Sequence, residues 1–97
     1  MIAEADAVGR VTELLRTRHW AELSCRGETY LIQPENNKGW DYLGLWSTGS
    51  AAFCLARAFY DGPGEPDADA VRELLSEPCI RGESCLALLE RGELELL

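Results

Sequence analysis

The sequence has no run of about 18 consecutive apolar residues, which is the length that a membrane-spanning helix needs. Its first residues carry Glu4 and Asp6 at positions where an export signal has basic residues followed by an apolar stretch. We therefore expect no association with membranes and no export, and we predict a cytoplasmic protein.

Histidine is scarce, because the chain contains only His19. A cysteine or serine nucleophile needs a base within hydrogen-bonding reach, so His19 with Cys25 or Cys54 is the pairing to weigh. A lone histidine at the junction of a helix and a strand is more often a solvated or capping residue. We predict that the protein is not an enzyme and has no catalytic residues; a small thiol-dependent enzyme is the alternative.

The cysteines lack the closely spaced pairs from which zinc sites are built, and no C-x-x-C motif occurs. In a protein without an export signal, thiols are expected to stay reduced and to pack as small hydrophobic side chains. We predict this for all four cysteines, and we predict neither a metal nor a cofactor. The four are Cys25, Cys54, Cys79 and Cys85.

Basic residues are also few, since 9 Lys and Arg stand against 17 Asp and Glu and the formal net charge is −8. Residues 61–97 contain ten of the acids and three of the bases. Affinity for nucleic acids comes mostly from Lys and Arg that neutralise phosphates, so we expect no binding to DNA or RNA. The acidic third is either a solvated face that keeps the protein soluble or a surface offered to a basic partner. A mimic of nucleic acid that inhibits a DNA-binding protein is a further alternative.

What the sequence does contain is an ordinary globular composition, with 46% hydrophobic and 27% charged residues. A length of 97 residues matches one domain, so we expect residues 1–97 to form a single domain. A chain of this size buries only a modest core, and a homodimer would bury more surface.

The pattern of apolar residues predicts a helix followed by antiparallel strands. Arg26-Gly27 connects the first two strands as a hairpin, and Pro34 is expected to end the second because proline cannot donate to a strand ladder. The last of these segments fits a strand or a short helix, and the short loop before it favours a strand. The segments are a helix at 3–17, strands at 20–25, 28–33 and 40–47, a turn at 35–39, and residues 53–60.

The C-terminal third predicts two short helices after a loop at residues 61–66 that is rich in Gly and Pro. Asp67 is expected to cap the first helix, which Pro78 ends, and Ser84 to begin the second, which Gly92 ends. The alternating tail after Gly92 is either an edge strand or an end docked on the last helix. The predicted fold is α+β, a small antiparallel sheet of three to four strands with the N-terminal helix and the two C-terminal helices on one face.

The third strand places Trp40, Tyr42 and Trp46 on one face and Leu43 and Leu45 on the other. Large aromatic side chains on one side of a strand form either half of a core or an interaction surface. If the helices cover the leucine side, the aromatic side faces outward and marks a site for a partner protein or a second copy. Trp40, Tyr42 and Trp46 are therefore the candidate interaction surface.

Two segments, 34–43 (PENNKGWDYL) and 79–84 (CIRGES), resemble stretches in small uncharacterised proteins of Gram-positive gut bacteria and their mobile elements. The second segment has an apolar residue, x-Gly-x-Ser and then an amphipathic helix, as theirs do. The resemblance implies a small bacterial accessory domain and carries no activity. We predict a small non-catalytic protein-binding or regulatory module whose partner is another protein or a second copy of the chain.

Overall fold

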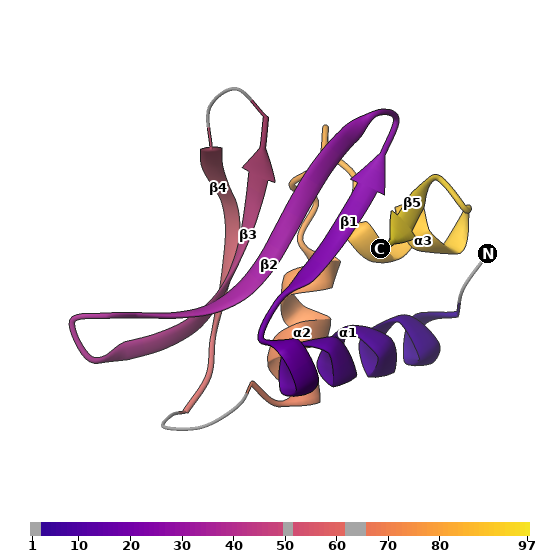
Figure 1. Cartoon of the computed structure of the whole chain (residues 1–97). Helices are drawn as coiled ribbons and strands as arrows, with labels where there is room; N and C mark the ends of the chain where they lie inside the picture. The colour runs from indigo at the N-terminus through magenta and orange to yellow at the C-terminus, as the bar shows by residue number, and fades with distance from the viewer. Residues whose placement is uncertain (1–2, 50–51, 62–65) are drawn as a thin grey trace.

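The computed structural model describes residues 3–49, 52–61 and 66–97, and these residues form an α+β fold (Figure 1). The predicted class is confirmed: an N-terminal helix, an antiparallel sheet, and two C-terminal helices that pack on the sheet. Most of the predicted loop at 61–66 falls outside the described residues. The elements are α1 (Glu4–Arg18), β1 (Ala21–Cys25), β2 (Glu28–Asn37), β3 (Trp40–Thr48), β4 (Ala52–Phe59), α2 (Ala68–Ser76), α3 (Cys85–Glu90) and β5 (Leu94–Leu96).

The sheet of the described chain has five strands in the order β4-β3-β2-β1-β5, one more than the predicted maximum. The additional strand is the C-terminal tail, which pairs antiparallel with β1 through Leu23 and Leu96. Residues 52–59 form a strand, as the short preceding loop indicated, and this strand pairs with β3. β1, β2, β3 and β4 pair in succession and antiparallel, so a short turn is enough to connect each strand to the next.

The prediction that Pro34 ends the second strand is wrong, because β2 continues through it to Asn37. The pairing of β1 with β2 stops at Ile32, while β3 pairs with β2 as far as Asn37. Pro34 therefore lies where β2 has a neighbour on one side only, and proline is tolerated in such an edge segment. The turn is correspondingly shorter than predicted, and the β2–β3 hairpin projects beyond the rest of the sheet (Figure 1).

Two-residue turns close both hairpins at β2. Arg26 and Gly27 have φ of 50° and 80°, and Lys38 and Gly39 have φ of 53° and 86°. Positive φ at both central residues is the geometry of the type I′ turn, whose twist matches that of paired strands. The basic residue accepts the left-handed conformation at the first position of each turn, and the glycine adopts it at the second without steric cost.

The three helices cover one face of the sheet, and the core lies between the two layers. Leu23, Leu43 and Leu45 on this face are completely buried. The helices contribute the apolar residues that pack against them: Val8, Val11 and Leu15 from α1, Val71, Leu74 and Leu75 from α2, and Cys85, Leu88 and Leu89 from α3. The opposite face of the sheet has no helix over it among the described residues.

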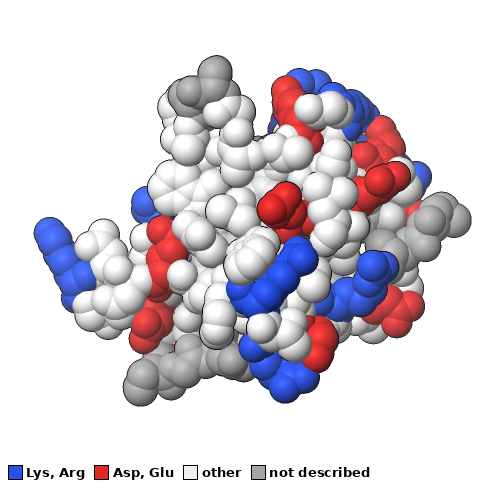
Figure 2. All heavy atoms as spheres, in the orientation of Figure 1, with Lys and Arg blue, Asp and Glu red and all other residues white. Residues whose placement is uncertain are grey.

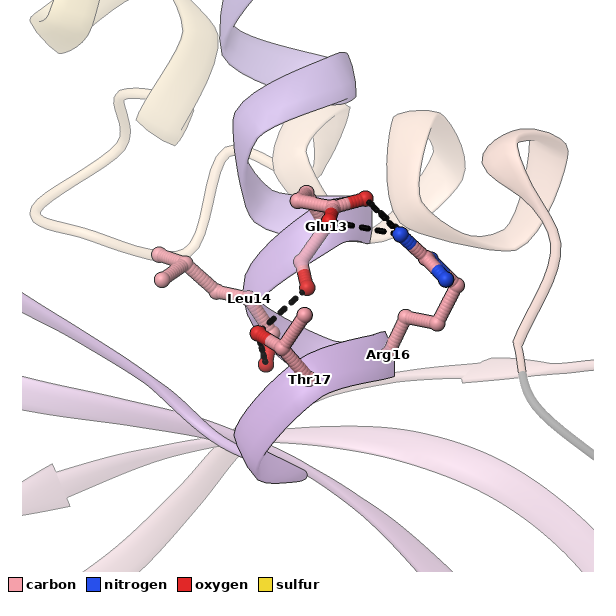
Figure 3. Close-up of polar contacts among 4 residues, drawn as sticks. All are labelled: Glu13, Leu14, Arg16 and Thr17. Carbon is pink, nitrogen blue, oxygen red and sulfur yellow. Dashed lines mark hydrogen bonds and ion pairs between the residues drawn. The ribbon is translucent and has the colours of Figure 1, made fainter.

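Polar side chains make hydrogen bonds at the N-terminal ends of α2 and α3 and on the outer face of α1. Asp67 and Ser84 cap α2 and α3 by accepting hydrogen bonds from the backbone N–H groups of Ala70 (2.8 Å) and Ala87 (3.1 Å). On the exposed side of α1, Arg16 donates to Glu13 over 2.6 Å, one turn away (Figure 3). No helix in the described ranges is long and apolar enough to cross a membrane.

Candidate interaction surface

The side of β3 with the aromatic residues faces away from the helices, on the outer face of the sheet. Trp40 is 68% exposed, Trp46 is partly exposed and Tyr42 is only 7% exposed. The three residues therefore share a face, as the alternation predicts, but they differ in how much of each ring meets solvent. In Figure 2, residues other than Lys, Arg, Asp and Glu cover the upper part of the area where β3 and β4 lie in Figure 1.

Tyr42 is buried on this outer face by side chains of the neighbouring strand β4. The Phe59 ring lies 5.4 Å from the Tyr42 ring, centroid to centroid, and the Arg57 guanidinium carbon lies 5.4 Å from the same centroid. Phe59 in turn meets Trp40 edge-on at 6.2 Å and is itself 55% exposed. Trp40, Phe59 and Tyr42 thus form a continuous aromatic patch, with Trp40 and Phe59 as its exposed part.

A β-bulge in β4 determines that Phe59 belongs to this patch. The register between β3 and β4 shifts after Leu45, so that Phe59 lies opposite Tyr42 and Ala58 opposite Leu43. Leu55 is the additional residue, because Ala56 pairs with Leu45 and Cys54 pairs with Trp46. Without this bulge, Ala58 would lie opposite Tyr42, and the Phe59 side chain would point to the helix side of the sheet. Sequence reasoning missed Phe59 and Arg57 for this reason, since alternation within residues 53–60 does not give the register against β3.

Glu35, which lies opposite Tyr42 in β2, accepts a hydrogen bond of 2.6 Å from the indole Nε1 of Trp46 further along β3. The carboxylate reaches the indole by lying over Gly44, where a Cβ atom would be 2.1 Å from Glu35 Oε2 and 2.7 Å from Trp46 Nε1. The absence of a side chain at Gly44 therefore makes room for the contact. Glu35 was predicted to be a turn residue, and its extended conformation follows from the continuation of β2 beyond Pro34.

The change Gly44→Ala is expected to displace the Glu35 carboxylate and to break its hydrogen bond with Trp46. The loss should lower the free energy of unfolding by about 1 kcal/mol, the usual value of such a bond. Urea unfolding measures the loss, and the indole N–H signal of Trp46 in an NMR spectrum reports the bond directly.

The matched control is Gly9→Ala in α1, where nothing lies within 4 Å of the added Cβ. This change should stabilise the protein slightly, because alanine favours a helix more than glycine does. An unchanged Trp46 indole signal in Gly44→Ala would contradict the proposed role of Gly44.

A cleft of about 510 Å³ lies where the aromatic patch meets the N-terminal end of α2. Trp40, Phe59 and Tyr60 contribute aromatic side chains to its lining. Burial, and then the neighbouring Asp41 carboxylate, raise the pKa of the Tyr60 hydroxyl, which stays neutral at physiological pH. The rest of the lining is mainly acidic, with Asp41, Asp61, Asp67, Asp69 and Glu73.

The structure does not bring His19 together with a cysteine. His19 is exposed at the C-terminal end of α1 in a left-handed conformation with φ of 67°, while Cys25 is buried in β1. No hydrogen bond within the described ranges joins His19 to a thiol; the half-buried Cys54 has its Sγ 3.5 Å from the Ala56 carbonyl oxygen, to which it donates. The thiols of all four cysteines are free, and Cys85 is completely buried.

The described part of the chain contains no group of three or more His, Cys, Asp or Glu residues that could hold a metal ion. Comparisons with protein-family models, with curated proteins and with solved structures find no match to this chain.

Proposed function

We propose that this chain is a small non-catalytic binding module that docks another protein on the outer face of its sheet. The observation that carries the proposal is the pair formed by Trp40 and Phe59, which are 68% and 55% exposed and in edge-to-face contact. No helix among the described residues covers this face. The binding partner is a different protein or a second copy of the chain.

Physical chemistry supports a docking role for this pair. Exposed apolar rings lose their unfavourable contact with water when a partner covers them, and aromatic residues dominate the energetics of protein interfaces. The two rings are also packed within the sheet face, because Phe59 contacts the buried Tyr42 and Trp40 contacts Phe59. A pre-organised surface binds with a smaller loss of side-chain entropy than a mobile one.

A variant in which the photo-crosslinking amino acid benzoylphenylalanine replaces Trp40 is expected to form a covalent complex with the partner protein when it is irradiated in a lysate of the source cells. The same replacement at Trp20 is the matched control, since Trp20 is 43% exposed but immediately precedes β1, which β2 separates from β3 and β4. The double variant Trp40→Ser and Phe59→Ser, tested by affinity capture, should retain at least tenfold less of the crosslinked partner than the Trp20→Ser variant does.

Equal crosslinking from Trp20 and Trp40, or capture that survives the double variant, would contradict a docking role for the patch. Light scattering on the purified protein identifies the occupant. A dimer that the double variant converts to a monomer makes the occupant a second copy, and a monomeric wild type makes it another protein. Circular dichroism shows that each variant keeps the fold, which is expected because the substituted rings are exposed.

A further inference from the structure

The aromatic patch and the acidic end of α2 meet in one cleft, although their residues are far apart in the sequence. Trp40 begins β3, Phe59 ends β4, and Asp69 and Glu73 lie on α2. The exposed rings of the proposed docking face therefore form one wall of a cleft whose other walls carry carboxylates. In Figure 2, acidic atoms lie at the base of the projecting β2–β3 hairpin.

Several of these carboxylates already have partners within the chain. Asp67 caps α2 through the Ala70 N–H, and Asp69 accepts a hydrogen bond of 3.2 Å from Arg72. Asp41 accepts a hydrogen bond of 2.9 Å from the Asn36 side-chain amide.

Asp61 and Glu73 are exposed and have neither an ion pair nor a side-chain hydrogen bond with any residue that the structure describes. No lysine or arginine is among the described residues that line the cleft. The local charge is therefore negative beside exposed aromatic faces, and this combination complements a cation with a flat apolar surface.

We propose that this cleft binds an arginine side chain of the partner protein, with the guanidinium stacked on Trp40 and paired with Asp61 and Glu73. The proposal rests on the proposed function, because it names the chemistry of the group that docks on the patch. Arginine fits better than lysine, since its planar guanidinium stacks on an aromatic ring and at the same time donates to carboxylates.

The chain makes the same kind of contact within itself at two places. The Arg57 guanidinium carbon lies 5.4 Å from the Tyr42 centroid, and the Arg18 guanidinium carbon lies 5.2 Å from the Trp20 centroid. Trp40 has no such cation over it among the described residues, although it is the most exposed of these aromatic rings. Its ring is therefore available for a cation from outside.

The probe that tests this inference is a short peptide, acetyl-Gly-Arg-Gly-Arg-Gly-amide, titrated into the full chain and followed by NMR. Its control is the same peptide with citrulline for arginine, which keeps the size and the planar end group but removes the charge. The arginine peptide is expected to shift the Trp40 indole signal and to bind at least tenfold more tightly than the citrulline peptide. Added salt should weaken the binding.

The double variant Asp61→Asn and Glu73→Gln is expected to weaken binding of the arginine peptide about tenfold. The control variant, Glu22→Gln and Glu95→Gln, removes two exposed carboxylates from the other end of the sheet and should bind as the wild type does. Equal binding of the two peptides, or equal losses in the two variants, would overturn the inference.

The two proposals fail in different ways. If crosslinking from position 40 identifies a partner that the arginine peptide does not displace from the wild-type chain, the docking face stands and the arginine site is wrong. If the arginine peptide binds but no partner depends on Trp40 and Phe59, the proposed function is wrong and the cleft recognises a cation for another purpose.

Discussion

Cys85 is expected to react with iodoacetamide about a thousandfold more slowly in the folded protein than in concentrated guanidinium chloride at about pH 8. Burial raises the pKa of this thiol from 9.0 to about 12. The reactive species is the thiolate, and a pKa three units higher reduces its fraction about a thousandfold at a pH below both values. The rate should rise about tenfold per pH unit up to the raised pKa.

Mass spectrometry of labelled peptides measures all four cysteines in one experiment. Cys54 is expected to react first in the folded state, since it is partly exposed, and Cys79 more slowly because burial raises its pKa. The unfolded protein is the control, in which all four thiols should react alike. Labelling of Cys25 or Cys54 that is faster when folded than when unfolded would instead favour the thiol-dependent enzyme.

Leu45→Ala is expected to lower the free energy of unfolding by about 3 kcal/mol. Leu45 is completely buried between the sheet and the helices, so that truncation removes packed atoms and leaves a cavity. A loss of this size is a large part of the total free energy of unfolding of a typical protein domain, which is roughly 5–15 kcal/mol. Urea unfolding followed by circular dichroism measures it.

The matched control is Leu31→Ala in the adjacent strand, since Leu31 lies on the outer face opposite Trp46 and is only partly buried. Its loss should be about 1 kcal/mol, because little packed volume is removed. Equal losses for the two leucines would mean that a second layer covers the outer face in solution, as a dimer would.

Local sequence signals predicted most of the elements because their physical causes are local. Caps such as Asp67 and Ser84 satisfy N–H groups only three residues away, and Arg26-Gly27 sets its own turn by backbone conformation. The prediction that Pro34 ends the second strand failed because the effect of a proline on a strand is not local. The effect of Pro34 depends on whether β1 runs beside it, which is a property of strand pairing and not of the residue.

The sequence predicted the part of the candidate surface that depends on local alternation within one strand. Alternation along β3 placed Trp40, Tyr42 and Trp46 on one face, and they do share the outer face. The alternation along β3 could not show that Tyr42 is buried on this face. The side chains that bury Tyr42 are Arg57 and Phe59 of β4, and a β-bulge sets the register that places them there.

The sequence by itself determined the two surfaces on which our proposals rest: aromatic residues alternating along one strand, and an excess of acids in residues 61–97. Composition and side-chain period fix such properties without reference to distant residues. Only the tertiary structure decided which face of the sheet the helices cover, and that the start of β3 meets α2 in a common cleft. Both depend on packing between segments distant in the chain, where burial of Leu43 and Leu45 under the helices leaves Trp40 and Phe59 outside.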